Sequence, residues 1–130
     1  GRAAAGVRAI HLKKSDSVSG LDIIKKENSD KSRMVAVMAN GFAKQTALKE
    51  YKIQRRGGSG TKTAKITDKT GPVIGAHIVD DKVEEVLAFS TKGQAIRTPL
   101  KDIRVLSRAT QGVKIMNLEK GDNLVGIVCL

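Results

Sequence analysis

The stretch Gln54-Arg55-Arg56-Gly57-Gly58-Ser59-Gly60 places two arginines directly before a loop that is almost entirely glycine. Glycine accepts the left-handed backbone that tight turns require, and arginine offers planar donors that match phosphate oxygens. A loop of this composition is typical of a site where cations and backbone N–H groups approach an anion together. We call residues 54–60 the reference loop.

The same loop recurs on both sides, each time as an arginine, three residues, a glycine, one residue and a cation. The copies run from Arg2 to Arg8, from Arg56 to Lys62 and from Arg108 to Lys114. A period of about fifty residues is typical of stacked or toroidal repeat proteins. We therefore expect three repeat units, 1–53, 54–106 with the reference loop, and a partial unit over 107–130.

Each full unit is predicted to form about four short strands joined by polar turns. After the loop glycine we expect strands at 7–12, 61–66 and 113–118, and then strands with a glycine in register at 18–24, 73–79 and 124–130. Hairpins follow only twice, 34–38 with 42–46 and 86–89 with 94–98, each turning at a glycine. The sequence thus predicts an all-β, propeller-like (β-pinwheel) fragment of about two and a half four-stranded blades.

The third unit stops before its hairpin, which leaves strand edges exposed. Further blades of a longer protein, a second copy of the chain, or strand sharing between the chain ends would cover them. Residues 25–33 are polar and form an insertion relative to the second unit, so we expect a mobile outer loop there.

The charge balance points to a polyanionic partner. The chain has 24 Lys and Arg against 13 Asp and Glu, a formal net charge of +11, and nucleic acid is the expected partner of such a surface. Aromatic residues make up only 2 % of the chain, too few for stacking bases. We therefore expect contact with backbone phosphates and little sequence selectivity. No apolar run is long enough for a membrane span.

The single cysteine, Cys129, lies in the apolar run 124–130, so we expect a buried, unreactive thiol. One cysteine cannot form a disulfide within the chain, which fits a reducing compartment.

The reference loop closely resembles the gyrase A box, Gln-Arg/Lys-Arg-Gly-Gly-Arg/Lys-Gly, of the C-terminal domain of the A subunit of bacterial DNA gyrase. The stretches 40–46, 71–76 and 107–113 are also similar to that domain, and the resemblance covers essentially the whole chain, in the register of the last three blades. It implies a β-pinwheel whose basic rim binds and bends duplex DNA in support of negative supercoiling by an ATP-dependent type IIA topoisomerase. Ser59 replaces the usual cation, which removes one expected phosphate contact.

The resemblance further implies the partners and the compartment. We expect three partners, namely duplex DNA, the gyrase B subunit, and the remainder of the gyrase A subunit. The expected place is the bacterial cytoplasm at the nucleoid, and no catalytic residue, metal or cofactor is expected in this part. The expected DNA-binding residues are Gln54, Arg55, Arg56, Gly57, Gly58, Gly60, Lys62, Arg2, Arg8, Lys44, Arg97, Arg108 and Lys114. Arg55 and Arg56 are the expected anchor.

Three other functions stay open from the sequence. The chain could be the C-terminal domain of the topoisomerase IV A subunit, a propeller that docks an acidic protein, or an RNA-binding protein that uses its single Arg-Gly-Gly. Nucleotide binding at residues 57–63 is disfavoured, because no Gly-Lys-Ser/Thr triplet closes the loop. A metal site is disfavoured as well, because His11 and His77 have no second ligand at a suitable spacing.

Overall fold

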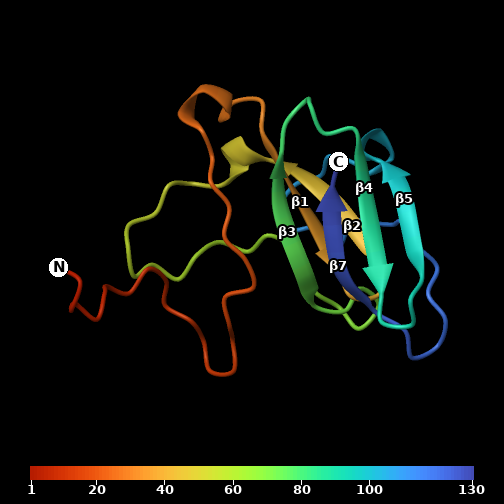
Figure 1. Cartoon of the computed structure of the whole chain (residues 1–130), viewed down its shortest axis with the longest axis horizontal. Helices are drawn as coiled ribbons and strands as arrows, with labels where there is room; N and C mark the ends of the chain where they lie inside the picture. Colours follow the sequence, from red (N-terminus) through yellow and green to blue (C-terminus); the bar gives the residue numbers. More distant parts are fainter.

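The computed structural model describes residues 1–130 and contains two antiparallel sheets (Figure 1). The first sheet has the strand order β3-β1-β2-β6 and the second β5-β4-β7. The strands are β1 (Arg33–Met38), β2 (Phe42–Ala47), β3 (Val73–Val79), β4 (Glu85–Ser90), β5 (Ala95–Pro99), β6 (Val113–Lys114) and β7 (Leu124–Cys129). Single 3-10 turns lie at η1 (Lys26–Asn28), η2 (Leu48–Glu50) and η3 (Leu100–Asp102). None of these helices is long and apolar enough to cross a membrane.

The two predicted hairpins are present. β1 pairs with β2 up to Val37 and Ala43, and β4 pairs with β5 up to Phe89 and Ala95. Gly41 lies in the first turn with a φ of 86°, and a methyl group there would overlap with the carbonyl oxygen of Met116. A glycine is therefore required at this turn both by the backbone angle and by the close approach of the third unit.

Both sheets combine strands from different sequence units. β3 of the second unit pairs with β1 of the first, and β7 of the third unit pairs with β4 of the second. The registers are equivalent, because Val37 faces Gly75 and Phe89 faces Gly126, with an irregularity directly after each pair. The all-β prediction is confirmed, but a unit does not fold into a sheet of its own, since each hairpin takes its neighbouring strand from the next unit.

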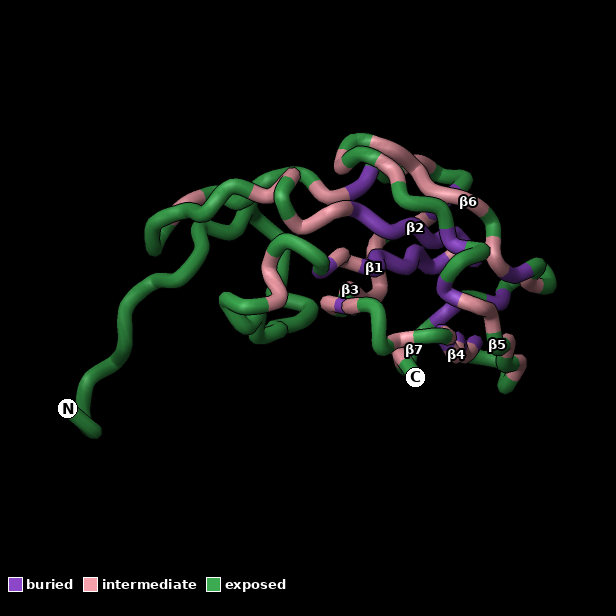
Figure 2. Tube along the Cα trace, turned by 90° about the horizontal axis from the view of Figure 1, so that it is seen from above, coloured by how far each residue is buried: buried purple, intermediate pink, exposed green.

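Several predicted strands do not form. Residues 7–12, 18–24 and 61–66 lie outside every strand, and only Val113–Lys114 of 113–118 is a strand. β3 and β7 each pair with the hairpin of the preceding unit, and no hairpin precedes 18–24 within these residues. Backbone without a partner strand has no ladder to join. Residues 1–27 are consequently exposed along their whole length, as Figure 2 shows for the green arm that leads to the N-terminus.

The hydrophobic core lies between the two sheets. Val35 and Val37 of β1 pack with Val86 and Ala88 of β4, and Leu124 of β7 completes this contact. All five are buried, and burial of a valine or leucine side chain contributes about 1.5–3 kcal/mol. The core therefore holds the two sheets against each other. We call the sheet β3-β1-β2-β6 the first blade and the sheet β5-β4-β7 the second blade.

The opposite face of the first sheet is covered as well. Met38 and Phe42 pack there with Ala64, which belongs to the segment between the reference loop and β3. β1 is consequently buried on both faces, in agreement with the purple tube of β1 in Figure 2. This packing anchors the start of the second unit on the hairpin of the first.

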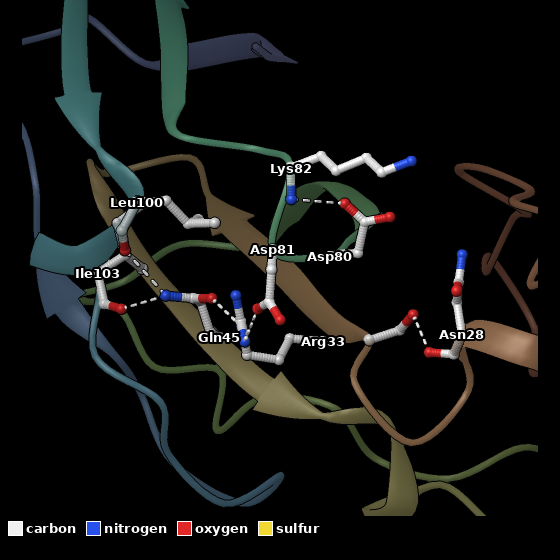
Figure 3. Close-up of polar contacts among 9 residues, drawn as sticks. Asn28, Arg33, Gln45, Asp80, Asp81, Lys82, Leu100 and Ile103 are labelled. Carbon is white, nitrogen blue, oxygen red and sulfur yellow. Dashed lines mark hydrogen bonds and ion pairs between the residues drawn. The ribbon is translucent and has the colours of Figure 1, made fainter.

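A polar cluster joins the two blades at one end (Figure 3). The amide of Gln45, buried in β2, donates to the carbonyl oxygens of Leu100 and Ile103 at 2.9 and 2.6 Å. Arg33 Nε donates to Gln45 Oε1 at 2.8 Å, and Arg33 Nη1 contacts Asp81 at 3.3 Å. The Gln45 amide nitrogen thereby connects β2 with the turn η3 of the second blade, while its Oε1 is held by Arg33 of the neighbouring strand β1.

The thiol of Cys129 lies partly buried in β7. Burial, and to a smaller extent the charge of Asp22, raise the pKa of Cys129. A thiol with a raised pKa is a poor nucleophile at neutral pH, so Cys129 serves packing, as the sequence predicts.

Candidate nucleic-acid interface

The three repeated loops share their backbone shape. Gly6, Gly60 and Gly112 have φ angles of 88°, 78° and 84°, in the left-handed region that favours glycine. Their surroundings differ, because nothing lies within 4 Å of a methyl group placed on Gly6, whereas one on Gly112 would meet the carbonyl oxygen of Ala43 at 2.5 Å. The third loop therefore packs closely on β2, whereas the space beside the glycine of the first loop is empty.

One repeated hydrogen bond connects the loops in series. His11 N donates to Gly58 O at 2.8 Å, and Lys65 N donates to Thr110 O at 3.0 Å. Each donor stands five residues after the glycine of its own loop, and each acceptor stands two residues before the glycine of the next loop. In Figure 1 the red segment at the N-terminus runs beside the yellow-green reference loop accordingly. The three loops thus follow one another along the molecule.

The reference loop presents two free guanidinium groups. Arg55 and Arg56 are exposed, and neither side chain has a hydrogen bond or an ion pair within the chain. Gln54 stabilises the loop from inside, because its Oε1 accepts a hydrogen bond from Gly60 N at 3.1 Å. Both arginines are therefore available to an external anion.

The glycine N–H groups of the reference loop are already used. Gly57 N donates to Ala9 O at 2.9 Å, and Gly58 N donates to Arg55 O at 3.3 Å. Gly60 N is occupied by Gln54. The expectation that these N–H groups would face an anion is therefore wrong; the glycines shape the loop, and the arginines supply the donors.

Arg108 connects the third loop to both preceding units. It is half-buried; its backbone N donates to Glu50 Oε2 at 3.1 Å, and its Nη1 donates to Lys62 O at 3.0 Å. Glu50 is absent from the residues predicted for this site, since an isolated acidic residue after a strand carries no recognisable signal. Lys62 itself is exposed beside this contact.

Lys44 lies beneath the third loop and not on the surface. The lysine is fully buried. Its Nζ donates to Ser107 O at 2.8 Å, to Arg108 O at 2.5 Å and to Thr110 Oγ1 at 3.3 Å. Burial lowers the pKa of Lys44 to about 8, with smaller effects from Glu50, which raises it, and from Arg108, which lowers it. The prediction that Lys44 contacts DNA directly is therefore contradicted by its burial.

The remaining predicted cations divide into two groups. Arg2, Arg8 and Lys114 are exposed, and Arg8 Nη1 lies 3.4 Å from His11 Nδ1. Arg97 is exposed on β5 of the second sheet, where its Nε pairs with Glu85 Oε2 at 2.5 Å. The exposed loop cations belong to the loops that the repeated hydrogen bond joins, whereas Arg97 is engaged within the second blade.

Comparison with known proteins identifies a family model over most of the chain. The model described as DNA gyrase C-terminal domain, beta-propeller, matches residues 1–25, 39–80 and 84–130. The A subunit of DNA gyrase from Mycolicibacterium smegmatis is 35 % identical over 127 residues, which cover 98 % of this chain and 14 % of the relative. The corresponding gyrase subunit from Staphylococcus epidermidis is 39 % identical over 121 residues, which cover 93 % of this chain and 13 % of the relative. The chain thus spans a small part of these relatives.

Two solved structures are similar as well. The structure of DNA gyrase A C-terminal domain has a TM-score of 0.71 and 26 % identity, over 80 % of this chain and 34 % of that one. The crystal structure of the C-terminal domain of DNA topoisomerase IV has a TM-score of 0.67 and 27 % identity, over 77 % of this chain and 30 % of that one. Together with the family model, these matches confirm the predicted β-pinwheel architecture.

Proposed function

This chain belongs to the family of DNA gyrase C-terminal β-propeller domains, as its sequence predicts, and from that premise we propose that it binds and bends duplex DNA. In this proposal it is a non-catalytic part of an ATP-dependent type IIA topoisomerase and supports negative supercoiling. The units 1–53, 54–106 and 107–130 are the successive repeats of its wheel. DNA cleavage and ATP hydrolysis are carried out by the gyrase B subunit together with the remainder of the gyrase A subunit. The proposed location of the enzyme is the bacterial cytoplasm, at the nucleoid.

The observation that carries the proposal is the serial arrangement of three cationic loops. Equivalent hydrogen bonds from His11 to Gly58 and from Lys65 to Thr110 join one loop to the next. Arg55 and Arg56 are exposed in the middle loop without a partner in the chain. A series of such loops offers phosphates a path, and the net charge of +11 supports the same partner.

The mechanism is geometric. Arginine and lysine side chains contact phosphates along the path, and these contacts carry little sequence information. A duplex that follows the loops must bend, which costs on the order of 1–6 kcal/mol for a site of 20–30 base pairs and is offset by the added contacts. Binding is therefore selective for DNA that bends easily and weakly selective for sequence.

The curated relatives favour gyrase over topoisomerase IV within this family. The solved domain of topoisomerase IV has nearly the same TM-score as the gyrase domain, so the fold alone does not separate the two. Both relatives described above are gyrase subunits, and the loop at Gln54 keeps six of the seven positions of the gyrase A box. We therefore assign the chain a role in the supercoiling enzyme.

The proposal is tested by an electrophoretic shift of linear duplex DNA with the double variant Arg55→Ala, Arg56→Ala. We expect the variant to lose affinity about tenfold or more, since each arginine contacts phosphate. The matched control is Lys101→Ala, Lys120→Ala, which removes the same charge from exposed positions outside the three loops. Equal binding by both variants would refute the assignment of the loop. Preferential binding of RNA in competition would instead favour an RNA-binding protein.

A further inference from the structure

The amine of Lys44 is the one buried cation beside the proposed DNA path. Lys44 lies in β2 of the first blade with no exposed surface, and its Nζ extends to the loop 107–112 of the third unit. Its acceptors are two main-chain carbonyl oxygens and the hydroxyl of Thr110. A buried ammonium group is retained at a cost in desolvation unless it is well hydrogen-bonded, and here three acceptors surround it.

The equivalent position of the second hairpin holds an apolar residue. Ile96 occupies the equivalent position in the second hairpin and is partly buried against the core. An apolar residue therefore serves packing at this position. Lys44 instead places a charged amine with three N–H donors beneath the third loop. We infer that the lysine serves its contacts with that loop.

The reference loop solves the same problem differently. Its Gln54 side chain accepts from Gly60 N and fixes the loop from within. The third loop has Leu106 at the position equivalent to Gln54 and therefore has no such side chain. Lys44 reaches it from β2 and fixes it from below through the carbonyls of Ser107 and Arg108.

We propose that Lys44 is the positioning residue of the third loop: it holds the carbonyl oxygens of Ser107 and Arg108 inward and keeps a fixed positive charge beneath the phosphate path. Carbonyl oxygens that faced a phosphate would repel it, and their bonds to Lys44 prevent this. The charged groups that face the amine are Glu50, from η2, and Arg108, from the loop. This inference rests on the proposed function, because the path is the one proposed for duplex DNA.

The test compares the wild-type chain with Lys44→Met, which keeps the length and the apolar stem, and with Lys101→Met, which removes an exposed lysine outside the loops. Duplex affinity is measured by fluorescence anisotropy at constant salt from pH 7 to pH 9.5. At pH 7 we expect Lys44→Met to bind about two- to fivefold more weakly, the range of a single screened charge. At pH 9.5, where the free wild-type amine is mostly neutral but still donates to the loop carbonyls, the difference should shrink, whereas Lys101→Met should follow the wild-type profile throughout.

A second measurement needs no variant. The NMR signal of the Lys44 ε-methylene group gives its titration midpoint in the free chain and in the presence of duplex DNA. Phosphates beside the loop stabilise the charged amine, so the midpoint should move to higher pH on binding. A lysine that only supports the fold, remote from phosphates, would keep its midpoint.

The outcomes separate the two proposals. If the wild-type chain does not bind duplex DNA, the proposed function fails, and hydrogen exchange of the amides in 107–112 still decides whether Lys44→Met loosens the loop more than Lys101→Met does. If the wild type binds, equal affinity of folded Lys44→Met at pH 7 together with an unmoved midpoint overturns the role of Lys44. If Lys44→Met does not fold, the midpoint in the wild-type chain decides alone.

Discussion

Gly112 lies directly against the peptide of Ala43, and at this point the third loop packs on the first hairpin. A methyl group on Gly112 would lie 2.5 Å from the carbonyl oxygen of Ala43 and 3.3 Å from Cβ of Lys44. The backbone of Gly112 also has a φ of 84°. Two independent restrictions therefore act at this glycine, a left-handed backbone and a closed space.

We expect Gly112→Ala to destabilise the chain by about 2–5 kcal/mol, the sum of a left-handed alanine and of overpacking. The matched control is Gly93→Ala, because Gly93 has a φ of 82° with nothing within 4 Å of an added methyl group. It should lose only about 1–2 kcal/mol, from the backbone angle alone. Urea unfolding followed by circular dichroism measures both losses. Equal losses would contradict the close approach of Gly112 and Ala43.

Gln45 and Arg97 occupy equivalent positions in the two hairpins and should differ strongly in their effect on stability. Gln45 is buried and donates to two carbonyl oxygens of the second blade. Gln45→Ala leaves these acceptors unpaired, for which we expect a loss of about 2–4 kcal/mol in urea unfolding. Arg97→Ala removes an exposed ion pair with Glu85 and should cost less than about 1 kcal/mol. A larger loss for Arg97→Ala than for Gln45→Ala would show that the blades are joined elsewhere.

The sequence predicts the parts of the fold that depend on local signals. The hairpins turn at Gly41 and Gly93, and Gly75 and Gly126 lie in the register that the repeat requires. The same pattern predicts a strand at 18–24, which is absent. The pattern specifies which residues can form a strand, but the strand forms only where the hairpin of a preceding unit supplies the partner.

The candidate site is predictable in its exposed part only. Arginines next to glycines identify the reference loop, whose arginines are exposed. The charge of Lys44 predicts a surface position, although its neighbours Ala43 and Gln45 are both buried and Ile96 stands at the equivalent position. The comparison of equivalent positions is the available signal. The acceptors of Lys44 belong to another unit, so the sequence of one strand does not identify them.

The affinity for duplex DNA should fall steeply with salt. If about six phosphates are neutralised, log Kobs falls with log salt concentration at a slope of about −5. The double variant Arg55→Ala, Arg56→Ala should reduce the slope by about 2, one for each arginine that no longer neutralises a phosphate. Titration by fluorescence anisotropy between low and moderate salt measures both slopes. A wild-type slope near zero would exclude phosphate contacts as the source of binding.

Asp122 should make the stability of the chain depend on pH in the acid range. It is buried in the turn before β7, and its Oδ1 accepts from Thr91 Oγ1 at 2.7 Å and from Lys92 N at 3.0 Å. Burial acts to raise the pKa of Asp122, but hydrogen bonds from Ser90, Thr91, Lys92 and Asn123 outweigh it and lower the pKa to about 2. The folded state thus binds the proton more weakly than the unfolded chain, whose carboxyl has the ordinary pKa of 3.8.

The stabilisation by Asp122 is therefore fully present above about pH 4 and is lost as the pH falls toward 2, since the unfolded state takes up the proton first. We expect Asp122→Asn to be less stable than the wild type at pH 6, and the difference in urea midpoint to shrink between pH 4 and pH 2. The control Asp102→Asn, at an exposed position of η3, should follow the wild-type curve. A difference between Asp122→Asn and the wild type that stayed constant from pH 6 to pH 2 would mean that the carboxylate charge does not stabilise this turn. The turn connects the hairpin of the second blade to β7 of the third unit through Thr91 and Lys92. Such a result would therefore mean that any acid dependence of this connection comes from other residues.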